Sequence, residues 1–83
     1  MKVLLIDDHP LFRVGLRGLV AQLDATVTVT EADSLSAAQQ FAGNHDGFDL
    51  LLIDLRMPGM DGSEGIKILK KAAPNAPLVV FSG

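Results

Sequence analysis

The chain has no cysteine, which excludes a disulfide framework and any thiolate metal site. It also has no apolar run near the roughly 20 residues that a membrane-spanning helix needs. Basic residues are not in surplus: the formal net charge of -3 argues against a protein that binds the phosphate backbone of nucleic acid. Asp7 and Asp8 interrupt the N-terminal apolar run, so a signal peptide is not indicated. We therefore expect a cytoplasmic chain that binds neither membrane nor nucleic acid.

The chain is rich in apolar residues for its length. Hydrophobic residues make up 48% of the 83 residues and charged residues only 20%, which favours a packed core over disorder. A chain this short forms at most one domain, and no internal repeat or linker divides it. We therefore interpret residues 1–83 as a single domain.

Four short segments are typical of strands, and they cover residues 3–6, 26–31, 49–54 and 78–81. The second alternates polar and apolar residues, which predicts an edge strand with one solvated face. The other three are continuous apolar runs, as expected of strands that are covered on both faces.

Helix-like patterns separate these strands. The first begins at Pro10 and the second is capped by Asp33 or Ser34. The third buries one face, made of Ile66, Leu69 and Ala73. Strands that alternate with helices predict an α/β fold with one doubly wound parallel sheet, helices on both faces and right-handed crossovers.

The first expected helix has one apolar face and two internal glycines. Five apolar side chains share the face, namely Phe12, Leu16, Leu19, Val20 and Leu23. Gly15 and Gly18 each cost about 1 kcal/mol relative to alanine in a helix. We expect close packing of the helix on the sheet to be the reason for these glycines.

Oxygen-bearing side chains stand where three of the strands end. The first strand leads into Asp7 and Asp8, the third ends at Asp54, and the fourth leads into Ser82, with no Lys or Arg beside them. Ligands of open α/β sheets bind beyond the carboxyl ends of the strands, and an all-oxygen, net-negative cluster suits a hard cation such as Mg²⁺. Taken singly, Asp54 is typical of an ordinary strand-ending acid and Ser82 of a turn, while His9 and His45 are expected to be merely exposed.

Three motifs in register carry a family resemblance. IDDHP, LLIDLRMPGMDG and VVFSG resemble the receiver domain of bacterial two-component response regulators. The stretch IDDHPLFRVGL is similar to the subfamily in which a receiver precedes a LuxR-type helix-turn-helix. The resemblance covers the whole chain and implies a flavodoxin-like fold with strand order 2-1-3-4-5.

The resemblance also implies roles for individual residues. Asp54 is similar to the phosphoacceptor, which takes a phosphoryl group from a sensor histidine kinase. Asp8 is similar to a direct Mg²⁺ ligand, Asp7 to a carboxylate that holds the ion largely through water, and the backbone carbonyl of Arg56 to a further ligand. Ser82 is similar to the switch hydroxyl that bonds the new phosphate.

The sequence ends at Gly83, directly after the fourth expected strand. The resemblance implies a further helix, strand and helix, including a lysine that pairs with the phosphate. We therefore expect an incomplete receiver of order 2-1-3-4 without an output domain. Because residues 78–81 would then form an apolar sheet edge, we expect a homodimer through that edge or by exchange of elements.

The main hypothesis is a phosphoacceptor signalling module of a transcriptional response regulator. It would perform Mg²⁺-dependent self-phosphorylation and dephosphorylation without being a turnover enzyme. One alternative is an inactive receiver fragment that acts only in interaction or dimerisation. The other is a phosphatase of the haloacid-dehalogenase type, which places two acids two residues apart on its first strand, whereas Asp7 and Asp8 are adjacent.

Overall fold

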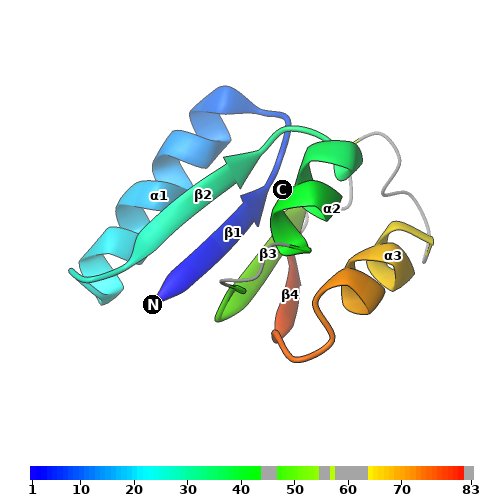
Figure 1. Ribbon diagram of the computed structural model, residues 1–83. Helices are drawn as coiled ribbons and strands as arrows, with labels where there is room; N and C mark the ends of the chain where they lie inside the picture. Colours follow the sequence, from blue (N-terminus) through cyan, green and yellow to red (C-terminus); the bar gives the residue numbers. More distant parts are fainter. Residues whose placement is uncertain (44–46, 55–56, 58–63, 82–83) are drawn as a thin grey trace.

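A computed structural model of the chain describes residues 1–43, 47–54, 57 and 64–81. Strands and helices alternate along it in the predicted order (Figure 1). The seven elements are β1 (Lys2–Ile6), α1 (Pro10–Leu23), β2 (Thr28–Ala32), α2 (Leu35–Ala42), β3 (Leu50–Asp54), α3 (Glu64–Ala72) and β4 (Leu78–Phe81). None of the helices in these ranges is both long and apolar enough to cross a bilayer.

The four strands form one parallel sheet in the order β2-β1-β3-β4. This is the predicted order, with β2 at one edge as its alternating pattern indicates. β1 lies between β2 and β3, so that Ile6 is in register with Ala32 on one side and with Ile53 on the other. The continuous apolar runs of β1 and β3 thus occupy the centre of the sheet.

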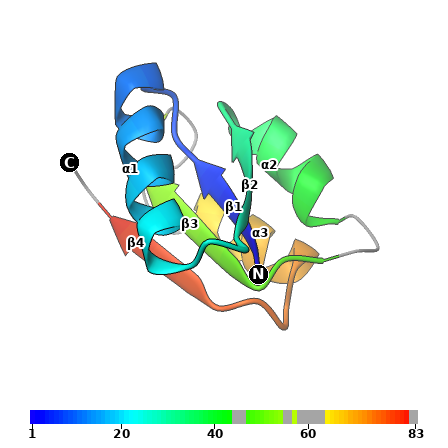
Figure 2. The same cartoon turned by 90° about the vertical axis from the view of Figure 1, so that its left-hand side faces the viewer.

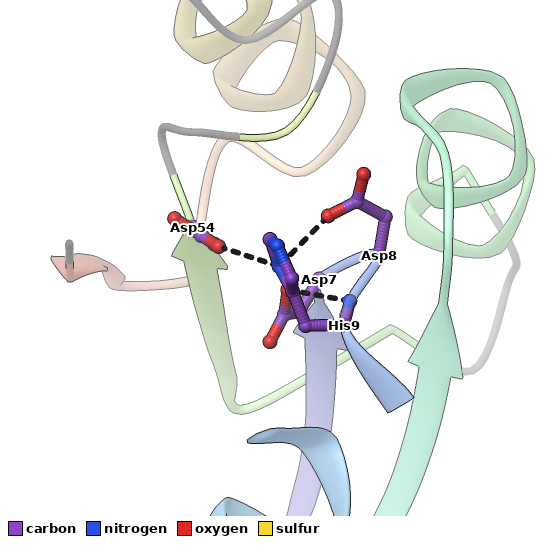
Figure 3. Close-up of side chains that lie close together, drawn as sticks. All are labelled: Asp7, Asp8, His9 and Asp54. Atoms are coloured by element: carbon purple, nitrogen blue, oxygen red, sulfur yellow. Dashed lines mark hydrogen bonds and ion pairs between the residues drawn. The ribbon is translucent and has the colours of Figure 1, made fainter. Parts of the chain in front are cut away.

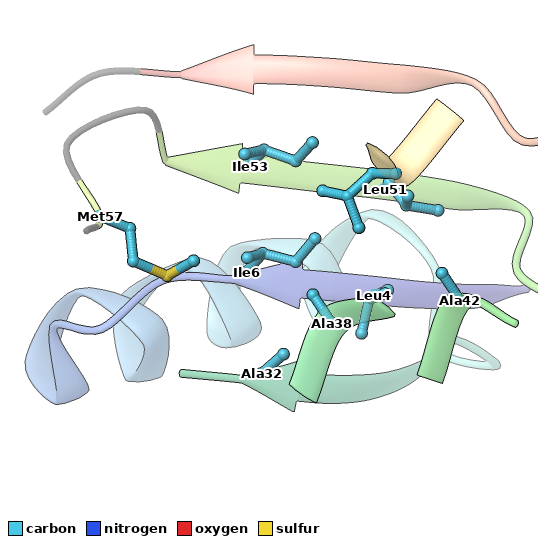
Figure 4. Close-up of a cluster of buried hydrophobic side chains, with 9 residues drawn as sticks. Leu4, Ile6, Ala32, Ala38, Ala42, Leu51, Ile53 and Met57 are labelled. Atoms are coloured by element: carbon cyan, nitrogen blue, oxygen red, sulfur yellow. The ribbon is translucent and has the colours of Figure 1, made fainter. Parts of the chain in front are cut away.

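Helices cover both faces of the sheet (Figure 2). α1 lies on one face, and α2 and α3 lie together on the other. The main core lies between the sheet and the α2–α3 pair (Figure 4). Its fully or almost fully buried members are Leu4, Ile6, Ala32, Ala38, Ala42, Leu51, Ile53, Met57 and Leu69. Met57, three residues beyond the end of β3, is 1% exposed, and its side chain packs into this core.

The second helix begins as the sequence predicts. The Ser34 hydroxyl accepts a hydrogen bond from the backbone N–H of Ala37 at 3.1 Å, which satisfies one of the free donors of the first turn. The helix then buries Ala38 and Ala42 against the core, while Phe41 is 38% exposed. Of the two predicted caps, Asp33 and Ser34, the structure selects Ser34.

Only part of the predicted apolar face of α1 is covered by the sheet. Phe12, Leu16 and Val20 are half-buried on the sheet, but Leu19 and Leu23 are 58% and 87% exposed. Ion pairs join α1 to β2 beside the half-buried stripe. The side chains of Arg13 and Arg17 lie 3.8 and 3.2 Å from the carboxylate of Glu31 on β2.

Close packing does not explain the two glycines of α1, so that expectation was wrong for the part of the chain that is described. A Cβ atom built on Gly15 or Gly18 meets no atom within 4 Å. Both residues are exposed, because they lie on the side of α1 that faces away from the sheet. Nothing in the described structure requires glycine at either position.

Candidate functional site

The ends of β1 and β3 bring three carboxylates together (Figure 3). The backbone N–H of Asp7 donates to the carbonyl of Ala32 at 3.0 Å, which extends the β1–β2 pairing by one residue. Since Ile6 is in register with Ile53, the residues that follow them, Asp7 and Asp54, reach the same rim of the sheet. Asp8, next along the chain, adds a third carboxylate to this rim.

Two of these carboxylates are fully sealed from solvent. Asp7 and Asp54 are both 0% exposed, and the side chain of Asp8 is 32% exposed. The buried Oδ2 of Asp7 accepts no hydrogen bond from any residue that the structure describes. A buried carboxylate oxygen without a donor is strongly unfavourable unless a cation or another partner reaches it. The rim therefore suits a positively charged ligand.

His9 is the unexpected member of this site. Its Nδ1 lies 3.0 Å from Oδ1 of Asp7, 3.0 Å from Oδ1 of Asp8 and 3.6 Å from Oδ2 of Asp54 (Figure 3). Its backbone N–H also donates to Oδ1 of Asp7 at 3.0 Å. The ring is half-exposed, with 52% of its side-chain surface accessible, but its Nδ1 edge points into the acidic cluster.

The sequence predicts that His9 is merely exposed, with no chemical role. The signal that could have found it is its position, because it directly follows the Asp7-Asp8 pair and directly precedes Pro10, where α1 begins. Proline fixes the first backbone angle of the helix, so the short turn before it holds His9 close to the strand end.

The donor set of this rim fits a divalent cation. Asp7, Asp8, His9 and Asp54 each offer one ligand atom, and these four atoms lie within 4.8 Å of one another. Carboxylate oxygens are the preferred ligands of hard divalent ions, and three carboxylates meet at this rim. Two further predicted members, the backbone carbonyl of Arg56 and the hydroxyl of Ser82, lie outside the described residues, as does His45.

Comparison with known protein families agrees with this geometry. Residues 3–83 match the family model for the response regulator receiver domain. The chain belongs to the response regulator receiver family. The match includes the ends of both strands that carry the carboxylates, so the acidic rim lies within the receiver domain.

Individual relatives support the same family. The chain is 41% identical over 81 residues to the glycerol metabolism activator of Pseudomonas putida, an alignment that covers 98% of this chain and 37% of that relative. It superimposes on RcsB from Salmonella enterica serovar Typhimurium, solved bound to a promoter with the phosphomimetic BeF3-, with a TM-score of 0.83 and 31% identity over 99% of this chain and 41% of RcsB.

A third similar protein was solved in a phosphorylated state. This response regulator from Burkholderia pseudomallei contains a phosphorylated aspartic acid, a calcium ion and citrate, and it matches with a TM-score of 0.75 and 29% identity. The alignment covers 99% of this chain and 46% of that protein. The chain thus spans well under two thirds of the length of each of these relatives.

Proposed function

We propose that this chain is the phosphoacceptor module of a transcriptional response regulator, with Asp54 as the residue that is phosphorylated. One observation carries the proposal: the fully buried carboxylate of Asp54 shares its rim with those of Asp7 and Asp8. The phosphorylated aspartic acid in the similar Burkholderia protein supports the same chemistry.

In the proposed reaction, a carboxylate oxygen of Asp54 attacks the phosphorus atom of a phosphohistidine on a sensor kinase. The new P–O bond forms as the P–N bond breaks, and the electron pair leaves with the imidazole nitrogen, which takes up a proton. Little covalent work falls to the rest of the site, because phosphoryl transfer depends mainly on positioning and on charge stabilisation. β3 supplies the positioning, since Asp54 is its last residue.

Asp7, Asp8 and Asp54 are the residues that would hold Mg²⁺, together with the backbone carbonyl of Arg56. When bound, Mg²⁺ supplies the positive charge that offsets the negative charge on the phosphoryl oxygens. In the same proposal the hydroxyl of Ser82 bonds the phosphoryl group once it is on Asp54. The similar Burkholderia protein was solved with a calcium ion, which supports a divalent cation as part of the proposal.

The proposal describes a signalling module and not a turnover enzyme. Phosphorylation and hydrolysis of the aspartyl phosphate return the same carboxylate, and the useful output is the phosphorylated state itself. The haloacid-dehalogenase alternative fits less well, since Asp7 and Asp8 are adjacent directly after β1 and the third acid stands on β3.

The partners of the module follow from the proposed role. They are a sensor histidine kinase and, in a full-length regulator, a LuxR-type helix-turn-helix output that binds DNA in the cytoplasm. RcsB, which was solved bound to a promoter, supports a DNA-binding output for similar proteins. The described part of this chain contributes the receiver alone.

A second copy of the chain is a further proposed partner. Within the described residues β4 pairs only with β3, and its Val79 and Val80 are 47% and 40% exposed. An exposed apolar edge strand is a template for pairing with another chain. Light scattering should therefore detect a dimer that Val80→Lys dissociates. A monomer at every concentration would contradict edge pairing.

The phosphoacceptor role is tested by intact-mass spectrometry with a small phosphodonor. We expect the wild-type chain to gain the mass of one phosphoryl group when Mg²⁺ is present, and neither Asp54→Asn nor wild type in EDTA to gain it. Asp49→Asn removes the same charge at the other end of β3 and should keep the adduct. No adduct from a folded, Mg²⁺-binding wild-type chain would favour the interaction-only alternative.

A further inference from the structure

We infer that His9 supplies a nitrogen ligand to the cation site, so that the site accepts first-row transition-metal ions such as Co²⁺ as well as Mg²⁺. The inference rests on the metal site of the proposed function and assigns it one more residue. It starts from the position of the His9 ring, whose Nδ1 lies among Asp7, Asp8 and Asp54.

The spacing of the donor atoms matches a coordination shell. Metal–ligand bonds to nitrogen and oxygen are about 2.1 Å long for small divalent ions, so neighbouring ligands at right angles lie about 3.0 Å apart and opposite ones about 4.2 Å apart. Nδ1 of His9 lies 3.0, 3.0 and 3.6 Å from one oxygen of each of the three carboxylates. An ion placed among these atoms would have His9 and the carboxylates as neighbours.

The backbone holds the ring in this place. The N–H of His9 donates to Oδ1 of Asp7, and Pro10 follows directly as the first residue of α1. Because Nδ1 already lies beside all three carboxylates, ligation of an ion would use Nδ1, and Nε2 would carry the proton of the neutral ring.

A nitrogen ligand changes which cations the site prefers. Carboxylate oxygens suit Mg²⁺ and Ca²⁺, whereas imidazole suits later first-row ions, whose affinity for mixed nitrogen–oxygen sites is higher. An acidic rim without His9 would discriminate less in favour of the later first-row ions. With His9, Co²⁺ gains a bond that Mg²⁺ has little preference for.

The same distances also fit hydrogen bonds from His9 to the carboxylates, in which the ring takes the place of a cation. The two roles have opposite consequences. A ligand makes Co²⁺ bind more tightly, whereas a ring that competes with the ion makes every divalent cation bind more weakly. Substitution of His9 therefore separates them.

The experiment uses the untagged 83-residue chain, because a histidine tag would itself bind Co²⁺. The affinities for Co²⁺ and Mg²⁺ are measured by calorimetry for wild type, His9→Ala and His9→Phe, with His45→Ala as the control for the other histidine in the sequence. Proton NMR of the Co²⁺-loaded chain then looks for a strongly shifted, solvent-exchangeable imidazole N–H, which marks a ligating histidine. His9→Phe keeps a ring of similar size without a ligand atom.

We expect the ratio of the Co²⁺ to the Mg²⁺ affinity to fall at least about 10-fold in both His9 variants, as loss of even a supporting partner of a metal ligand does. The shifted N–H signal should vanish in both His9 variants and persist in His45→Ala. An unchanged affinity ratio, tighter binding of both ions in the variants, or a signal that only His45→Ala removes would overturn the assignment. Failure of wild type to bind Mg²⁺ at all would instead overturn the metal site of the proposed function.

Discussion

Two pairs of neighbouring residues at the centre of the sheet are equally buried, but one pair is apolar and the other carries like charges. Ile6 and Ile53 are in register on β1 and β3, and both are 0% exposed. Asp7 and Asp54 follow them directly and are also 0% exposed. The same strand pairing therefore places an apolar contact and a like-charge contact one residue apart.

The favourable free energy of the apolar contact and the unfavourable free energy of the charged contact are of similar magnitude. Burying an isoleucine side chain contributes about 1.5–3 kcal/mol. Two unit charges about 4–5 Å apart repel by roughly 3–4 kcal/mol at an effective dielectric constant of about 20, and the ligand atoms of the rim lie within 4.8 Å of one another. Without a cation, the rim offsets much of what the adjacent core residues contribute. The core is thus what holds an intrinsically unfavourable site in place.

The largest effect is expected at the apolar pair. Ile53→Ala removes a fully buried side chain and should lower the free energy of unfolding by about 2–5 kcal/mol, a large part of the stability of so small a domain. Urea titration followed by circular dichroism measures it. Leu11→Ala, at a residue that is 88% exposed, should stay within about 0.5 kcal/mol. Equal losses in the two variants would show that the pair is not the core of the sheet.

The charged pair should respond in the opposite direction. In EDTA, Asp54→Asn removes one of the repelling charges and should raise the free energy of unfolding by about 1–4 kcal/mol. The same substitution should abolish the rise in melting temperature that Mg²⁺ gives wild type. Asp49→Asn, at the opposite end of β3, should do neither. A destabilised Asp54→Asn in EDTA would mean that the rim is already neutralised by its own residues.

The sequence predicts some features of the acidic rim and of the fold but not others. The convergence of Asp7 and Asp54 is predictable because parallel strands end at the same rim, and the apolar runs identify the central strands. The ring position of His9 is not, since a side-chain rotamer in a turn leaves no periodic signal. The exposure of Leu19 and Leu23 on α1 is not predictable either, because the apolar stripe does not show which of its members the sheet covers.

A smaller effect is expected on the other face of the sheet, where α1 carries glycines that have no close neighbours. Gly18→Ala should stabilise the chain by about 0.5–1 kcal/mol, because alanine is the better helix former and nothing obstructs its methyl group. Gly47→Ala is the contrasting variant, since Gly47 has φ of 68° and should lose about 1–2 kcal/mol. Thermal unfolding of the two variants measures both changes in stability. Loss of stability in Gly18→Ala would show that another part of the chain covers α1.

The smallest effect concerns an exposed carboxylate that already has its partners. Hydrogen bonds from the side chain and backbone of Thr26 hold the pKa of Asp24 below its ordinary value of 3.8. A pKa lowered in the folded state gives stability that is present above pH 4 and is lost as the pH falls through the folded-state pKa. Thr26→Val should reduce this acid-dependent part of the stability, as measured by urea titrations at pH 2–6. Identical pH profiles would contradict it.

The position of β1 in the sheet also affects how the chain folds during its synthesis. Val3 pairs with Val29, 26 residues later, and with Leu50, 47 residues later. At typical synthesis rates of about 5–20 residues per second, its second partner emerges roughly 2–10 s after it. During that interval the apolar strand has an unpaired edge, the feature that promotes aggregation of nascent chains. Among the described strands, β1, which leads into Asp7 and Asp8, is therefore the one that the growing polypeptide leaves partly unpaired longest.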